Sequence, residues 1–133
     1  MIYLCDTNII SELAKPQPNP GVLDWSSELT TMALSVITLE EITYGLIAKP
    51  NPRIQAWFQT FLKTYCQIIP VTPAIAQTAG EWRGQFRVTG ITRSQADMLI
   101  AATAKVHQLT LVTRNIRDFE GCELSLVNPF SPE

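Results

Sequence analysis

The stretch Ile2-Tyr3-Leu4-Cys5-Asp6-Thr7-Asn8 sets the pattern from which the fold can be predicted. Its first four residues are typical of a short buried strand, and an aspartate follows directly. Two further apolar runs, residues 32–37 and 109–113, also lead into segments that carry acidic residues. Helical patterns separate these runs. Alternating strands and helices, with strands apolar on both faces, predict an α/β fold with a parallel sheet.

The remaining segments can be assigned from periodicity, prolines and capping residues. Thr7 or Asn8 is expected to cap the first helix, and Thr38 is expected to open the third. Strands are expected at residues 2–5, 32–37, 67–69, 109–113 and 123–127, which gives a sheet of about five strands. Helices are expected at residues 7–14, 20–29, 38–48, 53–65, 73–88 and 93–107.

Length and composition restrict the class of protein. The length of 133 residues predicts one domain over residues 1–133. The formal net charge of −2 argues against broad electrostatic binding to nucleic acid, but it leaves room for a local basic rim. No signal-peptide pattern and no apolar run of membrane-spanning length occurs. We therefore expect a cytoplasmic protein.

Several kinds of site can be set aside from the sequence. The three cysteines lie far apart, which predicts neither a zinc site nor a disulfide framework and agrees with a reducing cytoplasm. His107 is the only histidine and lies near a predicted helix C-terminus, where contact with solvent is its usual role. No glycine-rich phosphate loop occurs, which excludes a Walker-type nucleotide site.

Four acid-bearing segments are expected to meet at one edge of the sheet. Asp6, the pair Glu40-Glu41 and residues 115–118 all follow strand ends, and ligands of parallel sheets bind outside those ends. Asp97 lies near the start of a helix that runs antiparallel to the strands, so it begins at the same edge. Converging carboxylates repel one another unless protons or a divalent cation hold them together. This pattern predicts a metal-dependent enzyme, and we expect one that cuts phosphodiesters.

Helix capping is the competing interpretation of these acids. Thr38-x-x-Glu41, Ser94-x-x-Asp97 and Asn115-x-x-Asp118 all resemble capping boxes, in which a carboxylate contributes roughly 0.3–1 kcal/mol. Asp97 differs because its neighbours are apolar all round, which predicts a buried helix. An unpaired buried carboxylate costs several kcal/mol, so a partner such as a cation explains Asp97 better. Glu40 and Glu41 point about 100° apart, and the residues themselves leave the choice between them open.

Five stretches in order carry a family resemblance over nearly the whole length. They are Leu-Cys-Asp-Thr-Asn-Ile-Ile-Ser-Glu (residues 4–12), Ser-Val-Ile-Thr-Leu-Glu-Glu-Ile (35–42) with Tyr44-Gly45, Ala-Asp-Met-Leu-Ile-Ala-Ala-Thr-Ala (96–104), residues 109–119 with Thr-Arg-Asn, and Asn-Pro-Phe (128–130). With these stretches the chain resembles PIN-domain ribonucleases, specifically the VapC-type toxin of a type II toxin–antitoxin pair. The resemblance implies a three-layer α/β/α PIN-like domain.

The resemblance also implies roles for individual residues. Asp6, Glu41 and Asp97 map to metal ligands, which selects Glu41 over Glu40. Asn115 stands where the family often has an acid, so the fourth position would be filled by its amide oxygen or by Asp118. The implied ion is Mg²⁺ or Mn²⁺, which carboxylate oxygens suit.

Further residues are expected to support this chemistry. Asn8 and Thr113 are candidates for orienting the carboxylates. The resemblance implies an endoribonuclease with an RNA substrate, a cognate antitoxin protein and a homodimer. The alternative is an inactive PIN-like interaction module whose carboxylates only cap helices. A rim that grips phosphates could be formed by Arg83, Arg87, Arg93, Arg114 and Arg117.

Overall fold

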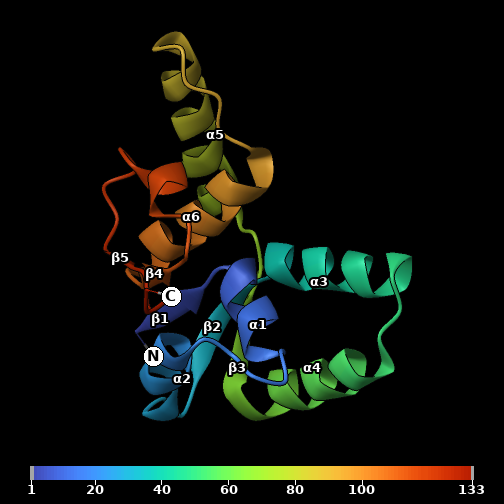
Figure 1. Ribbon diagram of the computed structural model, residues 1–133. Coiled ribbons are helices and arrows are strands. Elements are labelled where there is room, and N and C mark those ends of the chain that lie inside the picture. Colours follow the sequence, from blue (N-terminus) through green and yellow to red (C-terminus); the bar gives the residue numbers. More distant parts are fainter. Residues whose placement is uncertain (1, 133) are drawn as a thin grey trace.

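The computed structural model describes residues 2–132 and is built on a five-stranded sheet (Figure 1). The strand order is β3-β2-β1-β4-β5 and every pair is parallel, so the predicted α/β fold is confirmed. In the centre, Leu4 pairs with Ala33 on one side and with Leu111 on the other. The strands are β1 (Tyr3–Cys5), β2 (Met32–Ser35), β3 (Cys66–Ile69), β4 (Thr110–Val112) and β5 (Leu126–Val127).

Helices cover both faces of the sheet and complete three layers. Leu4 and Cys5 are neighbours in β1, yet they belong to two different core clusters because successive strand residues point to opposite faces. Leu4 packs with residues of α5 and α6, whereas Cys5 packs with residues of α1, α2 and α4. The helices are α1 (Thr7–Leu13), α2 (Pro20–Ser27), α3 (Val36–Ala48), α4 (Pro52–Tyr65), α5 (Pro73–Val88) and α6 (Gln95–His107), with a 3-10 helix η1 (Ile116–Phe119).

The start of α3 differs from the sequence prediction. The strand β2 ends at Ser35, and the Ser35 hydroxyl accepts a hydrogen bond from the Ile37 N–H at 3.0 Å. Ser35 is therefore the N-cap, and the helix begins at Val36 rather than at Thr38. Thr38 lies fully buried within the helix, so the competing interpretation of Thr38-x-x-Glu41 as a capping box is wrong. The β-branched pair at 36–37 favours a strand locally, but the cap and the packing of α3 override that preference.

Two other caps also differ from the prediction. The N-cap of α1 is Asp6, whose carboxylate accepts a hydrogen bond from the Thr7 N–H, and not Thr7 or Asn8. Residues 116–119 form a short 3-10 turn. The Asn115 backbone carbonyl accepts the Asp118 N–H at its start, and the Asn115 side chain makes no capping hydrogen bond. The capping box that Asn115-x-x-Asp118 resembles is therefore not formed. The other boundaries differ from the predicted ones by a few residues at most.

The segment after β5 returns to the start of α2. Asn19 caps α2, and its side-chain oxygen also accepts hydrogen bonds from the N–H (2.9 Å) and the hydroxyl (3.1 Å) of Ser131. A Cβ added at Gly21 would lie 2.5 Å from the Ser131 nitrogen, so the close approach requires glycine there. This docking carries Phe130 to the carboxyl edge of the sheet. Within residues 2–132, no helix is long and apolar enough to cross a membrane.

Candidate active site

A polar cleft of about 440 Å³ lies at the carboxyl edge of the sheet. Its walls come from α1, α3, α6, the segment after β4 and the docked segment after β5. Three of the four acid-bearing segments expected at this edge contribute an acid to it, and the fourth contributes an amide. The lining residues are Asp6, Thr7, Asn8, Ser11, Glu12, Lys15, Glu41, Asp97, Arg114, Asn115 and Phe130.

Asp6 is the most firmly held acid of the cleft. Its side chain is almost fully buried, and Oδ1 accepts the Thr7 N–H at 2.8 Å. Oδ2 accepts the Thr113 hydroxyl at 2.8 Å and the Asn8 side-chain amide at 3.2 Å. Burial raises the pKa of Asp6 above its usual range despite these hydrogen bonds, and repulsion from Asp97 and Glu41 adds to the rise. The carboxylate therefore has a fixed orientation and would gain from a nearby cation.

Asn8 and Thr113 connect Asp6 to the segment that follows β4. The Asn8 side-chain oxygen accepts the Arg114 N–H at 3.2 Å, and the Thr113 hydroxyl accepts the Asn115 N–H at 3.0 Å. The structure places both where groups that orient a carboxylate would lie. Their functional role stays a prediction.

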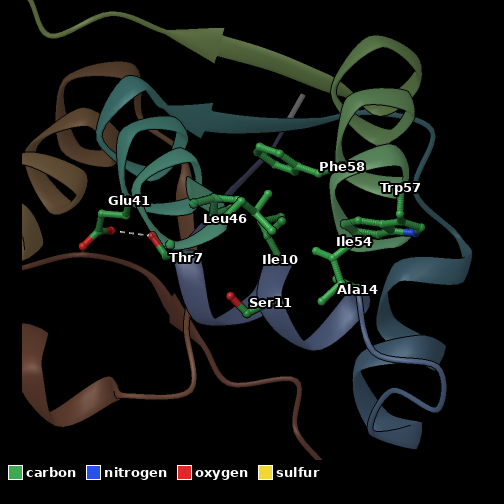
Figure 2. A pocket seen from close by; sticks show the side chains of 11 residues that line it. Thr7, Ile10, Ser11, Ala14, Glu41, Leu46, Ile54, Trp57 and Phe58 are labelled. Carbon is green, nitrogen blue, oxygen red and sulfur yellow. Dashed lines mark hydrogen bonds between the residues drawn. The ribbon is translucent and has the colours of Figure 1, made fainter. Parts of the chain in front are cut away.

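Glu41, and not Glu40, faces the cleft. Glu41 Oε1 accepts the Thr7 hydroxyl at 2.6 Å, and Figure 2 shows this bond between α3 and α1. The same Thr7 hydroxyl lies 3.1 Å from that of Thr38. Glu40 is exposed and lines a separate hollow on the other side of α3, beside Tyr44. The α3 register thus points one of the two adjacent glutamates into the cleft.

Asp97 lies in the first turn of α6, and its N–H donates to the Ser94 hydroxyl at 3.0 Å. The expectation that Asp97 is buried among apolar side chains is wrong, because it is half-buried at the cleft while Met98 and Ile100 fill the core. Desolvation still raises the pKa of Asp97, and repulsion from Asp118 and Glu41 contributes. A hydrogen bond between the Ser94 side chain and the Asp97 carboxyl lowers that pKa without cancelling the rise.

The residues predicted for the fourth site position and for the phosphate-gripping rim do not all reach the cleft. Asn115 lines the cleft, whereas Asp118 is exposed and does not line it. Of the five arginines predicted to form one rim, Arg114 alone lines the cleft, where its guanidinium lies 4.7 Å from the centre of the Phe130 ring. Three others, Arg83, Arg87 and Arg93, line a separate hollow along α5, and Arg117 lines neither cavity.

The comparison with protein families agrees with this arrangement. The model of the family described as "PIN domain" matches residues 3–121. The chain belongs to the PIN-domain family. Its relatives are VapC-type toxins, as the resemblance predicted. "VapC ribonuclease Y4jK" of Sinorhizobium fredii is 34% identical, over 99% of this PIN domain and 99% of the relative.

Two solved structures extend the comparison. The PIN domain is similar to VapBC2 of Rickettsia felis bound to a DNA fragment from its promoter, with a TM-score of 0.81, 31% identity, and 96% and 98% of the two chains covered. It is also similar to a toxin–antitoxin complex from Klebsiella pneumoniae, with a TM-score of 0.76, 26% identity, and coverage of 98% and 99%.

Glu12 and Lys15 of this PIN domain line the cleft, although the sequence analysis did not select them. Glu12 is buried and pairs with the Lys15 ammonium at 2.8 Å, and it also accepts the Asn19 N–H at 2.8 Å. The hydrogen bond from Lys15 lowers the pKa of Glu12. A signal was present, because Asn8 and Glu12 are four residues apart on one helix face.

The donor set of the PIN domain suits a hard divalent cation. Asp6, Glu41 and Asp97 offer carboxylate oxygens to one cleft, and a cation would offset both their burial and their mutual repulsion. Within residues 2–132, no three acidic, histidine or cysteine side chains lie close enough together to enclose an ion by themselves. Mg²⁺ typically takes one or two carboxylates and completes its shell with water and phosphate, so it does not require three such side chains in close contact.

Proposed function

We propose that this PIN domain is a metal-dependent endoribonuclease and the toxin of a VapBC-type toxin–antitoxin pair. The observation that carries the proposal is the convergence of Asp6, Glu41 and Asp97 on one cleft at the carboxyl edge of the sheet. The relative named VapC ribonuclease supports the reaction class. The solved toxin–antitoxin complex supports the kind of partner.

The residues of the cleft would have different roles in phosphodiester hydrolysis. Asp6 and Asp97 would hold Mg²⁺ or Mn²⁺, and Glu41 would hold a second ion or orient a water. When bound, such an ion supplies an activated water and offsets charge on the scissile phosphate. Thr113 and Asn8 keep the Asp6 carboxylate in one orientation through their hydrogen bonds.

The cationic side of the cleft would position the RNA. Arg114 stands at the rim beside the Phe130 ring, where a guanidinium can bind a phosphate oxygen and the ring can stack on a base. Lys15 lies on the same rim, and its ammonium can move from Glu12 to a phosphate because more than half of its side chain is exposed. Asn115 lines the same cleft.

An apolar groove beside the cleft supports an antitoxin partner (Figure 2). It has a volume of about 230 Å³ and runs between α1, α3 and α4, with Ile10, Leu46 and Trp57 among its walls. Thr7 and Glu41 line the groove as well as the cleft, so the two are continuous. We propose that an antitoxin segment lays apolar side chains in the groove and directs a basic side chain at Glu41.

The alternative function is an inactive PIN-like interaction module. Two observations favour it: the Asp6 carboxylate caps α1, and Ser94 caps α6 by accepting the Asp97 N–H, as the Ser94-x-x-Asp97 pattern suggested. The two functions differ in what a conservative change at Glu41 does, because Glu41 caps no helix in the structure.

The first test compares adjacent glutamates. Glu41→Gln should reduce RNA cleavage by at least about 100-fold, because it removes a charge from the cleft. The matched control Glu40→Gln changes the same charge on the exposed side of α3 and should cleave at the wild-type rate. Equal activity of the two variants, or an inactive wild type in Mg²⁺ and in Mn²⁺, would support the interaction module instead.

The second test measures the ion directly. Calorimetric Mn²⁺ titration should show binding to the wild type and weaker binding to Asp97→Asn. Equal binding by both, or none by the wild type, contradicts the metal site. RNA cleavage that survives Asp6→Ala would separately reject the assigned role of Asp6.

The partner proposal is tested in cells and in solution. Expression of the chain alone should arrest growth, and co-expression with the neighbouring small open reading frame should relieve the arrest and yield a complex. A harmless chain that binds no such product contradicts the toxin assignment. We also propose that the protein is cytoplasmic and forms a homodimer. Sedimentation of the purified protein would reveal the homodimer by its mass.

A further inference from the structure

A second large hollow, of about 570 Å³, lies away from the acidic cleft. It is formed by the C-terminal half of α5, which projects from the rest of the molecule, and by the segment that runs back towards α6 (Figure 1). Its lining combines two residue types, Gly80, Gly84 and Gly90 with Arg83, Arg87 and Arg93. We call this cavity the arginine hollow.

Two of the glycines have no explanation in the fold itself. Gly80 and Gly84 lie inside α5, where glycine destabilises a helix relative to alanine. A Cβ added at either position would meet no atom within 4 Å, so no neighbouring segment requires the space. Gly90 differs, because its φ of 85° favours glycine in the turn. The absence of side chains at 80 and 84 leaves the helix backbone open to an incoming ligand.

The arginines of the hollow are not neutralised by acids. The ion pair formed within residues 2–132 is the one between Lys15 and Glu12, on the other side of the sheet. Glu81, the acid of α5, accepts a hydrogen bond from Gln77 and does not line the hollow. Arg83 and Arg87 are four residues apart and therefore share one face of α5. The hollow thus presents positive charge in a protein whose formal net charge is −2.

Arg93 fixes one side of the hollow and links it to the cleft. Its guanidinium donates to the backbone oxygens of Arg117 (2.8 Å) and Glu120 (2.9 Å) and lies over the Phe86 ring at 4.7 Å. The Arg93 carbonyl accepts from Arg83 Nε at 3.4 Å. Arg93 directly precedes the cap of α6, the helix that carries Asp97, and its charge acts to lower the Asp97 pKa.

We propose that the arginine hollow binds the phosphodiester backbone of the RNA outside the segment that is cut. This inference rests on the proposed function and extends it to a second contact on the substrate. Guanidinium groups bind phosphate oxygens, and the two bare helical glycines let a sugar–phosphate chain approach closely. The hollow would hold a flanking part of the strand while the cleft holds the scissile phosphate.

The test is RNA binding as a function of salt. A fluorescein-labelled single-stranded RNA of about 20 nucleotides is titrated with the protein in EDTA, and the Kd is read by fluorescence anisotropy. The variant Arg83→Ala/Arg87→Ala should bind about tenfold more weakly at about 0.1 M salt. Loss of two phosphate contacts should also reduce the slope of log Kd against log salt by about 1.4.

Two further variants distinguish RNA binding at the arginine hollow from a general effect of the protein's positive charge on RNA affinity. Arg53→Ala removes the same charge from an exposed position on α4 and should bind RNA as the wild type does. Gly84→Leu keeps every arginine but fills the hollow, and it should also weaken binding several-fold. Circular dichroism melts verify that each variant is folded. Weakening by Arg53→Ala equal to that of the double variant, or full affinity of Gly84→Leu, would overturn the inference.

The outcomes also separate this inference from the proposed function. If the wild type cleaves RNA but the double variant keeps the wild-type Kd and slope, the hollow is not an RNA contact. If the wild type cleaves no RNA but the double variant still loses affinity and slope, the hollow stands and the nuclease proposal falls. If the double variant keeps its RNA affinity but changes its sedimenting mass, the hollow is a protein contact, which also overturns the inference.

Discussion

Asp97 and Glu12 are acids of the same cleft whose pKa values are shifted in opposite directions, so we expect opposite effects on stability. Burial raises the pKa of Asp97, so its ionised form destabilises the metal-free fold at neutral pH. We expect Asp97→Asn to raise the Tm in EDTA at pH 7 by a few degrees. The gain should shrink as the pH falls towards the ordinary value of 3.8, where the wild type is protonated too.

Thermal melts across this pH range check the prediction. Asp24→Asn, at an exposed position on α2, is the control and should change the Tm little at any pH. A lower Tm for Asp97→Asn at pH 7 would show that Asp97 stabilises the metal-free protein and contradict the expectation.

Glu12 should show the reverse behaviour. The hydrogen bond from Lys15 lowers its pKa below the ordinary 4.5, so the pair stabilises the fold above that pH. Glu12→Gln should cost about 0.5–1 kcal/mol at pH 7, a modest value because Lys15 is largely exposed to solvent. The difference should disappear as the pH falls through the lowered pKa. Urea unfolding of both proteins at several pH values measures it, and a constant difference would exclude the ionic contribution.

At the scale of elements, α3 depends on a cap that the sequence analysis assigned to the wrong residue. Because the Ser35 hydroxyl accepts the Ile37 N–H, Ser35→Ala should lower the free energy of unfolding by about 1 kcal/mol. Thr43→Ala, an exposed change on the same helix, is the matched control and should have a small effect. Equal effects in urea unfolding would mean that the Ser35 bond contributes little to stability.

The alternation of strands and helices could be predicted because each strand is a short apolar run between helical patterns, as at Tyr3–Cys5. The topology then placed Asp6 and Asp97 at one edge without any side-chain detail. The sequence could not decide where α3 begins, because Val36 and Ile37 suit a strand equally well. Nor could it decide between Asn115 and Asp118, since that choice depends on a 3-10 turn that only tertiary packing determines.

The five arginines were predicted to form one phosphate-gripping rim, because the sequence shows which residues are charged but not where their side chains lie in the fold. Arg114 follows β4 and reaches the cleft, whereas Arg83 and Arg87 lie on a helix that projects away from it. Glu12 is a different case, because its spacing from Asn8 on α1 is visible in the sequence, whereas its contact with the Asn19 N–H is made only in the fold. The division of the arginines between two cavities is likewise determined by the tertiary structure.

At the scale of the whole molecule, Gly21 ties the segment after β5 to α2. Gly21→Ala should displace residues 129–131 and cost about 1–3 kcal/mol, because a Cβ there has no room beside Ser131. The control Gly45→Ala meets no atom within 4 Å and should stabilise α3 by about 0.5–1 kcal/mol. Urea unfolding measures both. If Gly21→Ala is as stable as the wild type, the docked segment does not restrict that position.

The central place of β1 in the sheet also determines which wall of the cleft can open locally. Asp6 is hydrogen-bonded through its N–H to Val112 and directly follows Leu4 and Cys5, which are fully buried. Amide hydrogens of β1 should therefore exchange with deuterium only when the whole domain opens. Those of the exposed segment around Asn115 should exchange through local opening, orders of magnitude sooner. Deuterium uptake followed by mass spectrometry would then show slow exchange at the Asp6 wall of the cleft and fast exchange at the Asn115 wall. The Asn115 wall would therefore open and close many times before the domain unfolds once.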